Sequence, residues 1–413
     1  MKHLDLAQKV LHDVLINDLT FKKALKNTFP KDGENKKYLS LVTSLTGCEL
    51  RHHLLFKKIV ENLNKEFSDV EKEYLYLSLA DIFFIKHYSK DDIILFLKSS
   101  LNGKYDDNIE KILNFEGKIG DLLNIDKASI EYISIRFNTP IWLIKMWNKH
   151  FGKANAFKSL KANVLPSRST YRFNENSDKK LNSDFVKTDI ENIYTYNGKN
   201  NLHKLDVYED GTIFSLKPAY KQIFDKYING LINEYTIFSG SDDSLIKELY
   251  ARSKGEKGIN VIVPDLSKRA DILRFIRTKN IKNINLFTGS ETISFKTGIS
   301  YKQDLIVFNP VSSSFDKIRS YPDYLLHFKK EQFDELISKQ KQQLKDLSEF
   351  VSDGGTLIYI VDTMNKKESS AVMTDFLLNH NDFELVYERQ IFPFEKDDIS
   401  LYYAVIRKNE QND

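Results

Sequence analysis

The chain has 413 residues, of which 41% are hydrophobic and 29% are charged, and its formal net charge is +3. This composition is typical of a folded globular protein and excludes a disordered or collagen-like chain. A chain of this length is expected to divide into two or three domains, each with its own apolar core. Because the net charge is small, a basic surface for a polyanion must come from local clustering.

The single cysteine, Cys48, excludes an internal disulfide and a thiolate-rich zinc site. The nine histidines are scattered, and none shows the spacing of metal ligands on a helix, so we expect no metal. No apolar run reaches the roughly 18 residues of a membrane span, and the N-terminus lacks the apolar core of a signal peptide. We therefore expect a cytoplasmic monomer with no membrane partner.

Residues 4 to 151 predict a helical bundle. This part of the chain is almost free of proline and glycine, and its apolar residues recur at spacings of three and four, as in Val10 and Val14. The pattern favours six or seven helices, and we interpret their aromatic residues as core. Cys48 lies in one of these apolar stripes, where a small buried hydrophobic residue is expected.

Residues 136–172, which begin near the end of the bundle, combine both tryptophans with basic side chains. Pro140 marks the start of a predicted helix. Basic residues interleaved with aromatic ones are typical of contacts to unpaired RNA. The alternative is a solvated lysine-bearing helix face with the tryptophans in the core. The candidate RNA contacts are Arg136, Lys145, Lys149, Lys153, Lys158, Lys161, Arg168 and Arg172.

Residues 175–200 are polar and are expected to form a loop or a peripheral insertion. Asp210–Phe214 predicts a glycine turn and a short strand, and Lys217–Tyr220 predicts the start of a helix. From Tyr235 onward, short apolar runs alternate with helical stretches, which predicts a doubly wound parallel sheet with an additional C-terminal strand pair. The predicted strands are residues 235–238, 260–263, 283–287, 304–309, 356–361 and 401–407.

Two segments near the C-terminus resemble the catalytic segments of a known family, the RsmB/Sun-type ribosomal RNA cytosine-C5 methyltransferases. Asn309–Asp323 resembles a family segment that reads approximately Asp-Ala-Pro-Cys-Ser-Gly and then Ile-Arg-Arg-His-Pro-Asp. Asp353–Thr363 resembles Gly-Gly-x-Leu-Val-Tyr-x-Thr-Cys-Ser. In this alignment Ser312 and Asp362 stand at the two positions where the family has its catalytic cysteines.

The resemblance extends over nearly the whole chain. Arg172 and Asn174 match an Arg-x-Asn motif of the family's junction, which implies that this region contacts RNA. The helical N-terminal part resembles the NusB-type RNA-binding domain of the family. The resemblance thus implies a NusB-like domain at residues 1–135, a small α+β linker and RNA-binding subdomain at 136–230, and a Rossmann-like methyltransferase domain at 231–413.

The resemblance also implies S-adenosylmethionine as cofactor, although most of the matching positions are altered. Gly240 remains from the glycine-rich turn after the first strand, whereas Asp242, Asp243 and Ser244 replace its other residues and would crowd the carboxylate of the cofactor. Two further candidate cofactor positions are Asp265, at the place of the ribose-binding acid, and Asn309, where the family has aspartate. Asp265 would be equally suitable as a helix N-cap.

Cytosine C5 becomes nucleophilic only after a thiolate adds to C6, so the family reaction requires a cysteine that neither Ser312 nor Asp362 supplies. The first hypothesis is therefore a pseudoenzyme that binds 16S ribosomal RNA or a ribosome precursor. The second is an active S-adenosylmethionine-dependent ribosomal RNA methyltransferase with a modified site. The third is that the NusB-like domain docks a protein or an antitermination-type RNA and that the remainder is scaffold.

Overall fold

The structure is a computed structural model that describes residues 1–30, 33–228, 236–240, 242–254, 258–264, 266–278, 281–288, 302–395 and 399–410. The chain forms two compact units. Unit 1 comprises Met1–Pro166 and Lys317–Lys329, and unit 2 comprises Ser167–Asp316 and Lys330–Asp413. This division differs from the three predicted domains, since residues 136–166 belong with the N-terminal helices. None of the helices in the described ranges is both long and apolar enough to cross a membrane.

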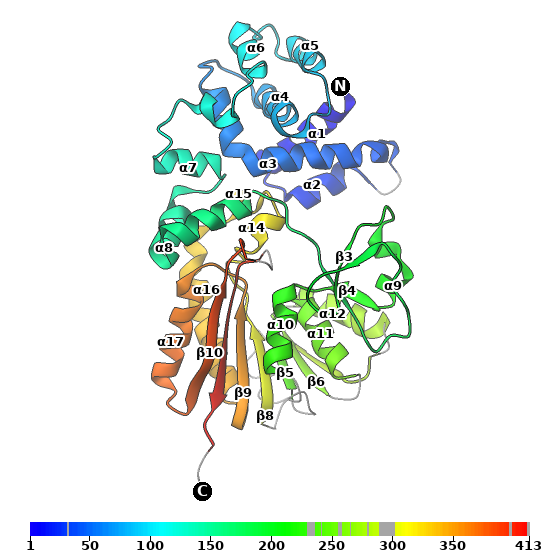
Figure 1. Cartoon of the computed structure of the whole chain (residues 1–413), viewed down its shortest axis with the longest axis vertical. Helices are drawn as coiled ribbons and strands as arrows, with labels where there is room; N and C mark the ends of the chain where they lie inside the picture. The colour runs from blue at the N-terminus through cyan, green and yellow to red at the C-terminus, as the bar shows by residue number, and fades with distance from the viewer. Residues whose placement is uncertain are drawn as a thin grey trace. The chain divides into compact units, whose positions relative to one another are not determined.

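Unit 1 is helical, as the apolar spacing predicts. Its apolar stripes meet in one core, where Leu4, Leu11, Leu45 and Phe56 have no exposed surface. Ser68 opens one helix with a capping box, in which Ser68 and Glu71 each accept a hydrogen bond from the backbone of the other. The helices are α1 (Lys2–Leu15), α2 (Phe21–Thr28), α3 (Leu39–Glu61), α4 (Asp69–Ala80), α5 (Lys90–Ser100), α6 (Asp107–Leu113), α7 (Ile130–Arg136) and α8 (Ile141–Asn163) (Figure 1).

The segment 317–329, which holds the short helices α14 (Lys317–Ser320) and α15 (Tyr324–His327), is part of unit 1 through its contacts. The Arg319 side chain donates to the backbone oxygens of Leu165 and Pro166 at 3.2 and 3.3 Å. The Asp323 carboxylate accepts from the amide of Phe21 at 2.8 Å. Arg319 and Asp323 both match the family motif, and in this structure they attach the segment to the helices of unit 1.

A small antiparallel sheet begins unit 2. Its four strands lie in the order β2-β3-β1-β4, with bounds β1 (Tyr171–Phe173), β2 (Phe185–Lys187), β3 (Ile193–Tyr196) and β4 (Ile213–Ser215). The expectation of a loop or insertion over 175–200 is wrong in part, because β2 and β3 lie within it. Both strands are short, and few of their side chains are apolar and buried, so they give little periodic signal. The predicted glycine turn and strand are confirmed, with Gly211 at φ 79° before β4.

The main sheet of unit 2 has seven strands in the order β10-β11-β9-β8-β5-β6-β7. β5 to β9 pair in parallel, whereas β10 and β11 add an antiparallel pair at one edge. All six predicted strands are confirmed, and β10 had no predicted range. The bounds are β5 (Thr236–Gly240), β6 (Ile259–Val263), β7 (Ile284–Thr288), β8 (Gln303–Asn309), β9 (Val351–Val361), β10 (Phe383–Ile391) and β11 (Leu401–Lys408).

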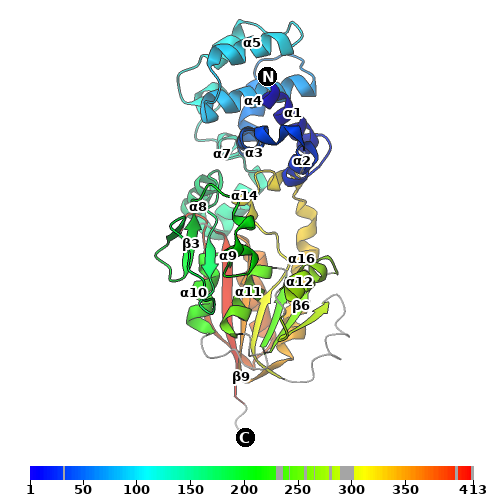
Figure 2. The same ribbon diagram turned by 90° about the vertical axis from the view of Figure 1, so that its right-hand side faces the viewer.

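Helices cover both faces of this sheet. The helices α10 (Pro218–Tyr227), α11 (Asp243–Arg252) and α12 (Leu266–Thr278) share one core with it. The helices α16 (Phe333–Ser348) and α17 (Ser370–Asn379) share the core on the other face. Figures 1 and 2 show α10 and α11 in green and α16 and α17 in yellow to orange around the sheet. The strand order reverses between β5 and β8, and in such sheets ligands bind at the carboxyl ends beside this reversal.

Candidate functional site

The carboxyl ends of β5, β8 and β9 lie side by side, because these strands are parallel neighbours. Ser312 follows β8, and Asp362 follows β9 directly. The Ser312 hydroxyl lies 3.4 Å from the backbone oxygen of Asp362. The fold thus brings together the two positions at which the resembled family has cysteines, although they are fifty residues apart in the chain.

The carboxylate of Asp362 is held from three sides. It accepts a hydrogen bond from the hydroxyl of Tyr220 at 2.5 Å and one from the ammonium of Lys217 at 3.0 Å. Its second oxygen lies 3.3 Å from the amide of Asn309. The side chain is only 14% exposed. A carboxylate with these partners is a poor nucleophile, since its lone pairs are already engaged.

Lys217 connects Asp362 to further acidic groups. Its ammonium is 2.9 Å from the carboxylate of Asp316 and 3.0 Å from the hydroxyl of Tyr220. That hydroxyl is also 3.3 Å from the carboxylate of Asp242. We call Lys217, Tyr220, Asp242, Asp316 and Asp362 the lysine cluster. It joins the N-terminus of α10 to the loops that follow β5, β8 and β9.

The electrostatics of the lysine cluster favour a charged lysine and a neutral tyrosine. Burial acts to lower the pKa of Lys217, but the carboxylates of Asp316 and Asp362 outweigh it and raise that pKa well above its ordinary value. Burial, with Asp362 beside the hydroxyl, raises the pKa of Tyr220 well above its ordinary value. Tyr220 therefore acts as a hydrogen-bond donor rather than as a base at neutral pH.

A sequence reading alone misses Lys217, Tyr220 and Asp316. Around Ala219 the resembled family has a Gln-Asp-x-Ala-Ser motif. With Ala219 in register, Lys217 stands at the family's aspartate and Tyr220 at its serine. Two changes in the sequence could have revealed them: Lys217 replaces an aspartate of the family motif, and Asp362 replaces a cysteine. A cation and an anion that replace other residue types in two motifs point to a new ion pair.

A second buried carboxylate, Glu368, lies beside the lysine cluster in the same pair of loops. It has no exposed surface and accepts hydrogen bonds from the amide and hydroxyl of Ser313 at 2.7 and 2.5 Å. Thr363 donates to it at 3.1 Å and Asn365 at 2.9 Å. We call these four residues, with Gln340 at 3.4 Å, the glutamate cluster. It fixes the loops after β8 and β9 through neutral donors.

Two of the predicted cofactor positions, Gly240 and Asn309, end adjacent strands. They are opposite each other in the sheet, and a Cβ atom at Gly240 would lie 2.5 Å from the backbone oxygen of Asn309. The close approach of β8 is therefore sufficient to require glycine at position 240. The Asn309 amide donates to the backbone oxygen of Ile360 at 3.0 Å as well as to Asp362. Asp265 lies outside the described residues.

The turn after β5 fits the carboxylate of S-adenosylmethionine poorly. Asp242 is the N-cap of α11, and its carboxylate accepts from the amide and the hydroxyl of Ser244 at 2.9 and 2.7 Å. Asp243, in the first turn, pairs with Lys247 at 2.8 Å. The helix N-terminus that would receive an anionic ligand already carries two carboxylates. Among the described residues, no group of three or more His, Cys, Asp or Glu side chains is placed to hold a metal ion.

Arg172 and Asn174, the predicted RNA contacts on β1 and after it, have partners within unit 2. Arg172 is 3% exposed, and its guanidinium lies 3.1 Å from the carboxylate of Glu248, which has no exposed surface. The backbone N–H of Asn174 donates to the backbone oxygen of Thr212 at 2.8 Å, and its side-chain oxygen accepts from the backbone N–H of Asn176 at 3.1 Å. The buried guanidinium is not presented to a ligand in this structure, because a charge in the interior is kept with its partner. Its position supports a structural role.

The basic residues on α8 are placed differently. Lys145 and Lys149 are exposed one turn apart, and Arg136 is half-buried at the end of α7. Phe157 is 40% exposed, with the ammonium of Lys161 4.6 Å from its ring centre. Of the two tryptophans, Trp147 is fully buried, whereas Trp142 stacks on Phe328. Lys145, Lys149 and Phe157 are thus exposed on α8, and their contact with RNA stays a prediction.

Comparisons with known proteins agree with the motifs. No family model matches the chain. A probable ribosomal RNA small subunit methyltransferase B from Bacillus subtilis is 24% identical over 277 residues, which cover 59% of this chain and 57% of the relative. A ribosomal RNA small subunit methyltransferase B from Proteus mirabilis is 28% identical over 105 residues, a quarter of each chain. The chain thus spans little more than half the length of the curated relatives it matches.

Solved structures extend the likeness to the whole chain. A protein designated PH0851 aligns with a TM-score of 0.74 and 15% identity over 98% of this chain and 99% of that one. NSun6 from Pyrococcus horikoshii, solved with SFG, aligns with a TM-score of 0.56 and 11% identity over 66% of this chain and 99% of that one. At such identities the likeness shows the fold alone, a Rossmann-like methyltransferase fold in unit 2. The chain is thus similar in sequence to ribosomal RNA small subunit methyltransferases B, and unit 2 has a Rossmann-like methyltransferase fold.

Proposed function

We propose that this protein binds ribosomal RNA and keeps the fold of a ribosomal RNA cytosine-C5 methyltransferase without transferring methyl groups. The observation that carries the proposal is the lysine cluster at the two cysteine positions. Asp362 stands where the nucleophile belongs and is bound by Lys217 and Tyr220. The hydroxyl of Ser312 contacts only backbone groups among its described partners. Neither side chain can add to C6 of cytosine as a thiolate does.

The remaining cysteine does not supply the missing group. Cys48 belongs to α3 of unit 1, whereas the lysine cluster belongs to unit 2. Burial, with Glu49 nearby, raises the pKa of its thiol to about 12. Cysteines that act as nucleophiles have pKa values at or below neutrality, so Cys48 is suited to packing rather than to catalysis.

The proposed RNA partner is small-subunit ribosomal RNA, the molecule in the names of both curated relatives. The α8 surface with Lys145 and Lys149 is the contact that we favour, since exposed ammonium groups suit phosphates, and the exposed ring of Phe157 on the same helix, with Lys161 over it, suits unpaired bases. Binding to ribosomal RNA in this way places the protein in the cytoplasm and requires no second copy of the chain.

Two measurements, of cofactor binding and of methyl transfer, test whether the protein lacks catalytic activity. Isothermal titration of the full chain with S-adenosylmethionine should give no heat of binding at micromolar concentrations, because Asp242 and Asp243 repel the carboxylate of the cofactor. Transfer of labelled methyl groups to 16S ribosomal RNA should be absent. Saturable micromolar binding together with transfer would contradict the pseudoenzyme.

The RNA surface is tested by reversing its charge. Lys145→Glu with Lys149→Glu should weaken binding to a 16S ribosomal RNA fragment about tenfold and reduce the slope of log affinity against log salt by about 1.5 to 2. Lys111→Glu on α6 is the matched control, because Lys111 is exposed on another helix of the same unit. An equal loss in the control and the double variant would show that only total charge matters.

The second candidate is an active methyltransferase with a modified site, and the fold supports it equally. The observation in its favour is that Asp362 and Ser312 still meet at the carboxyl edge of the sheet. This reading predicts methyl transfer that disappears in Asp362→Ala but survives in Glu335→Ala, a change on the exposed face of α16. Absence of transfer from the unchanged chain on ribosomal RNA, small subunits and their precursors would eliminate it.

A further inference from the structure

Unit 1 contains an open groove with a volume of about 890 Å³. It is bounded by α2, by the first half of α3, and by parts of the chain around residues 164–166 and 320–322. A volume of this size accommodates several side chains of a bound peptide or one drug-sized molecule. Apolar residues from α2, from position 85 and from the two later parts of the chain line it, namely Phe21, Leu25, Phe29, Ile85, Val164 and Pro322.

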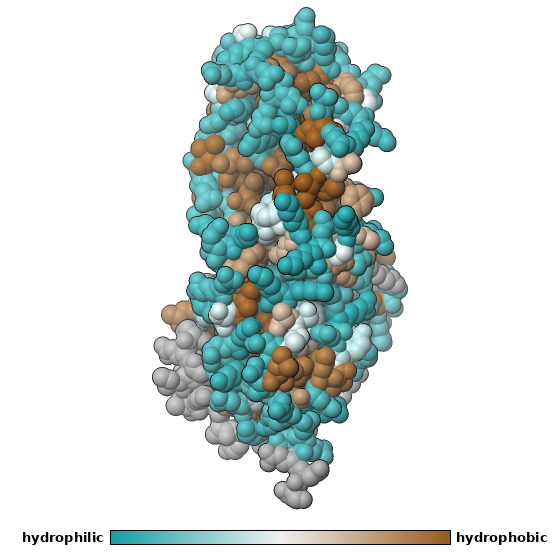
Figure 3. All heavy atoms as spheres, turned by 90° about the vertical axis from the view of Figure 1, so that its left-hand side faces the viewer, coloured by the Kyte–Doolittle hydropathy of each residue, from teal (hydrophilic) through white to brown (hydrophobic). Residues whose placement is uncertain are grey.

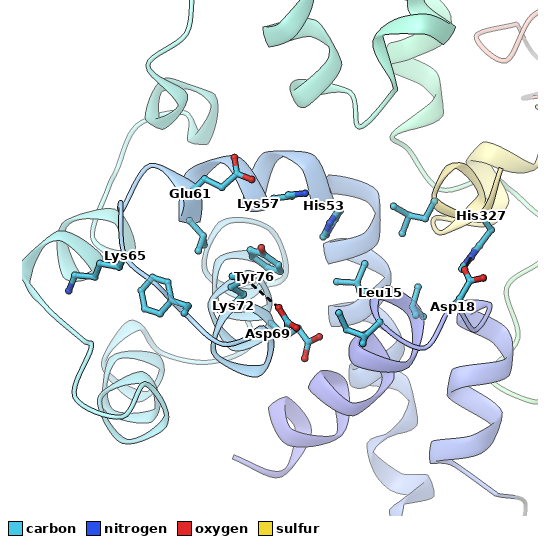
Figure 4. A pocket seen from close by; sticks show the side chains of 16 residues that line it. Leu15, Asp18, His53, Lys57, Glu61, Lys65, Asp69, Lys72, Tyr76 and His327 are labelled. Carbon is cyan, nitrogen blue, oxygen red and sulfur yellow. Dashed lines mark hydrogen bonds and ion pairs between the residues drawn. The ribbon is translucent and has the colours of Figure 1, made fainter. Parts of the chain in front are cut away.

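The charges that line this groove in the described part of the chain are all of one sign. Lys22 and Lys26 are exposed on α2, and Arg51 lines the groove from α3, whereas none of the described lining residues is acidic. A second cavity of unit 1, of about 460 Å³, differs in this respect. There Lys57, Lys65 and Lys72 are accompanied by four carboxylates, among them Asp69, which pairs with Lys72 (Figure 4). Of these two cavities, the first is therefore the better match for an anionic ligand.

His52 gives this groove an unsatisfied polar atom. The residue is 9% exposed, and its Nδ1 atom has no hydrogen-bond partner among the residues that the structure describes. Burial, with Arg136 and Arg51 nearby, lowers the pKa of His52 to about 4, so the ring is neutral at pH 7. The backbone of α3 is non-helical at this residue, and Asn138 satisfies the interrupted helix through Leu50 and Leu54. A buried polar atom without a partner is rare in proteins, and a bound ligand can supply one.

We propose that this groove docks an apolar segment of a partner protein whose flanking side chains are acidic. The lining is apolar in its walls and basic at Lys22, Lys26 and Arg51, which matches such a segment in both respects. RNA fits less well, because bases inserted among Leu25, Ile85, Val164 and Pro322 would leave their polar edges without partners. On the face shown in Figure 3, hydrophilic side chains cover most of the coloured surface and apolar side chains gather in separate patches.

The inference is independent of the proposed RNA function, because the groove is not lined by Lys145 or Lys149. Its test is a selection of random peptides of about 16 residues, enough for four helical turns, by display against the full chain. The enriched sequences should combine leucine, isoleucine or phenylalanine at helical spacing with aspartate and glutamate, and they should bind with micromolar affinity.

Gly47→Leu is the variant that fills the groove. A Cβ atom at Gly47 would lie 3.7 Å from the ring of Phe21, an ordinary contact, and leucine favours the helix more than glycine does. The variant should therefore remain folded, as judged by circular dichroism and thermal melting, and should bind the selected peptides at least tenfold more weakly. Lys111→Leu, which adds an exposed leucine on α6, is the matched control and should bind them normally.

Charge reversal completes the test. Lys22→Glu with Lys26→Glu should weaken the selected peptides about tenfold, whereas Lys111→Glu should not. A single-stranded RNA oligonucleotide should fail to displace a labelled peptide. Enrichment of basic peptides, equal binding by Gly47→Leu and the unchanged chain, or displacement by RNA would each overturn the proposal.

Discussion

The lysine cluster and the glutamate cluster share the loops after β8 and β9 of unit 2 but hold their carboxylates in different ways. Glu368 is bound by neutral donors from Ser313, Thr363 and Asn365. Asp362 is bound by a lysine as well as by neutral donors. Ser313 and Thr363 each adjoin a family cysteine position in the sequence. The loops after β8 and β9 are thus held by one set of residues, while the adjacent Asp362 belongs to an ion pair with Lys217.

The loops after β8 and β9 can therefore keep their shape while the groups around Asp362 differ. The residues that shape the loops face Glu368, and the residues that would perform chemistry face Lys217 and Tyr220. A substitution at Lys217 or Tyr220 therefore leaves the hydrogen bonds to Glu368 intact. The clusters should therefore differ in how strongly their members affect stability.

The largest effect is expected from Glu368→Gln. The amide can accept at only one atom and presents a donor to groups that are themselves donors, so we expect a loss of about 3 kcal/mol in the free energy of unfolding. Urea denaturation followed by circular dichroism measures this. The control, Glu335→Gln on α16, removes an exposed pair with Lys339 and should change the free energy by less than about 0.5 kcal/mol. Equal effects would contradict the assigned role of Glu368.

A smaller loss, about 2 kcal/mol, is expected from Lys217→Met. The change leaves the carboxylates of Asp316 and Asp362 without their cation, although a quarter of the lysine side chain is exposed and water can compensate in part. Adding Asp362→Asn should recover part of the loss, because it removes one of the unbalanced charges. A double variant no more stable than Lys217→Met alone would show that the two residues do not interact energetically.

Tyr220→Phe should cost about 1 kcal/mol at pH 7, since it removes one hydrogen bond to a charged group and keeps the ring in its buried position. Thermal denaturation detects this as a drop of a few degrees. Tyr359→Phe is a useful comparison, because Tyr359 is equally buried and donates to the backbone oxygen of Glu368. A similar cost in both variants would indicate that the charge of Asp362 adds little.

The smallest effect at neutral pH is on the pH dependence of stability, and it becomes distinct in alkali, where Lys217 and Tyr220 lose their protons. The pKa values of Lys217 and Tyr220 are both raised in the folded state, so their stabilisation is present below about pH 10 and declines as pH rises further. Above pH 10, unfolding of the unchanged chain releases the proton of Tyr220, and Tyr220→Phe abolishes this release. The free energy of unfolding should therefore fall less steeply with pH in the variant, and the slopes should differ by about 1.4 kcal/mol per pH unit. Identical slopes for the variant and the unchanged chain would place the ionisation elsewhere.

The sequence was most informative where patterns are local or motifs are long. Helical spacing identified the bundle, and alternation of short apolar runs with helices identified the doubly wound sheet. The prediction was weakest for β2, β3 and β10. The first two are short, and most of β10 is exposed at the sheet edge, so neither burial nor alternation marks them. Asp265 remains a prediction, as do the RNA contacts.

The sequence by itself determined the resemblance to the methyltransferase family, the two positions that lack its cysteines and the ranges of six strands, because each of these depends on residues close together in the chain. Only the tertiary structure decided what replaced the cysteines. Lys217 lies 145 residues from Asp362 in sequence, and no local pattern pairs them. The fold also decided that Arg172 is buried against Glu248 rather than exposed. Charged side chains pair with groups that lie near them in space, and only the complete fold decides which distant residues become neighbours.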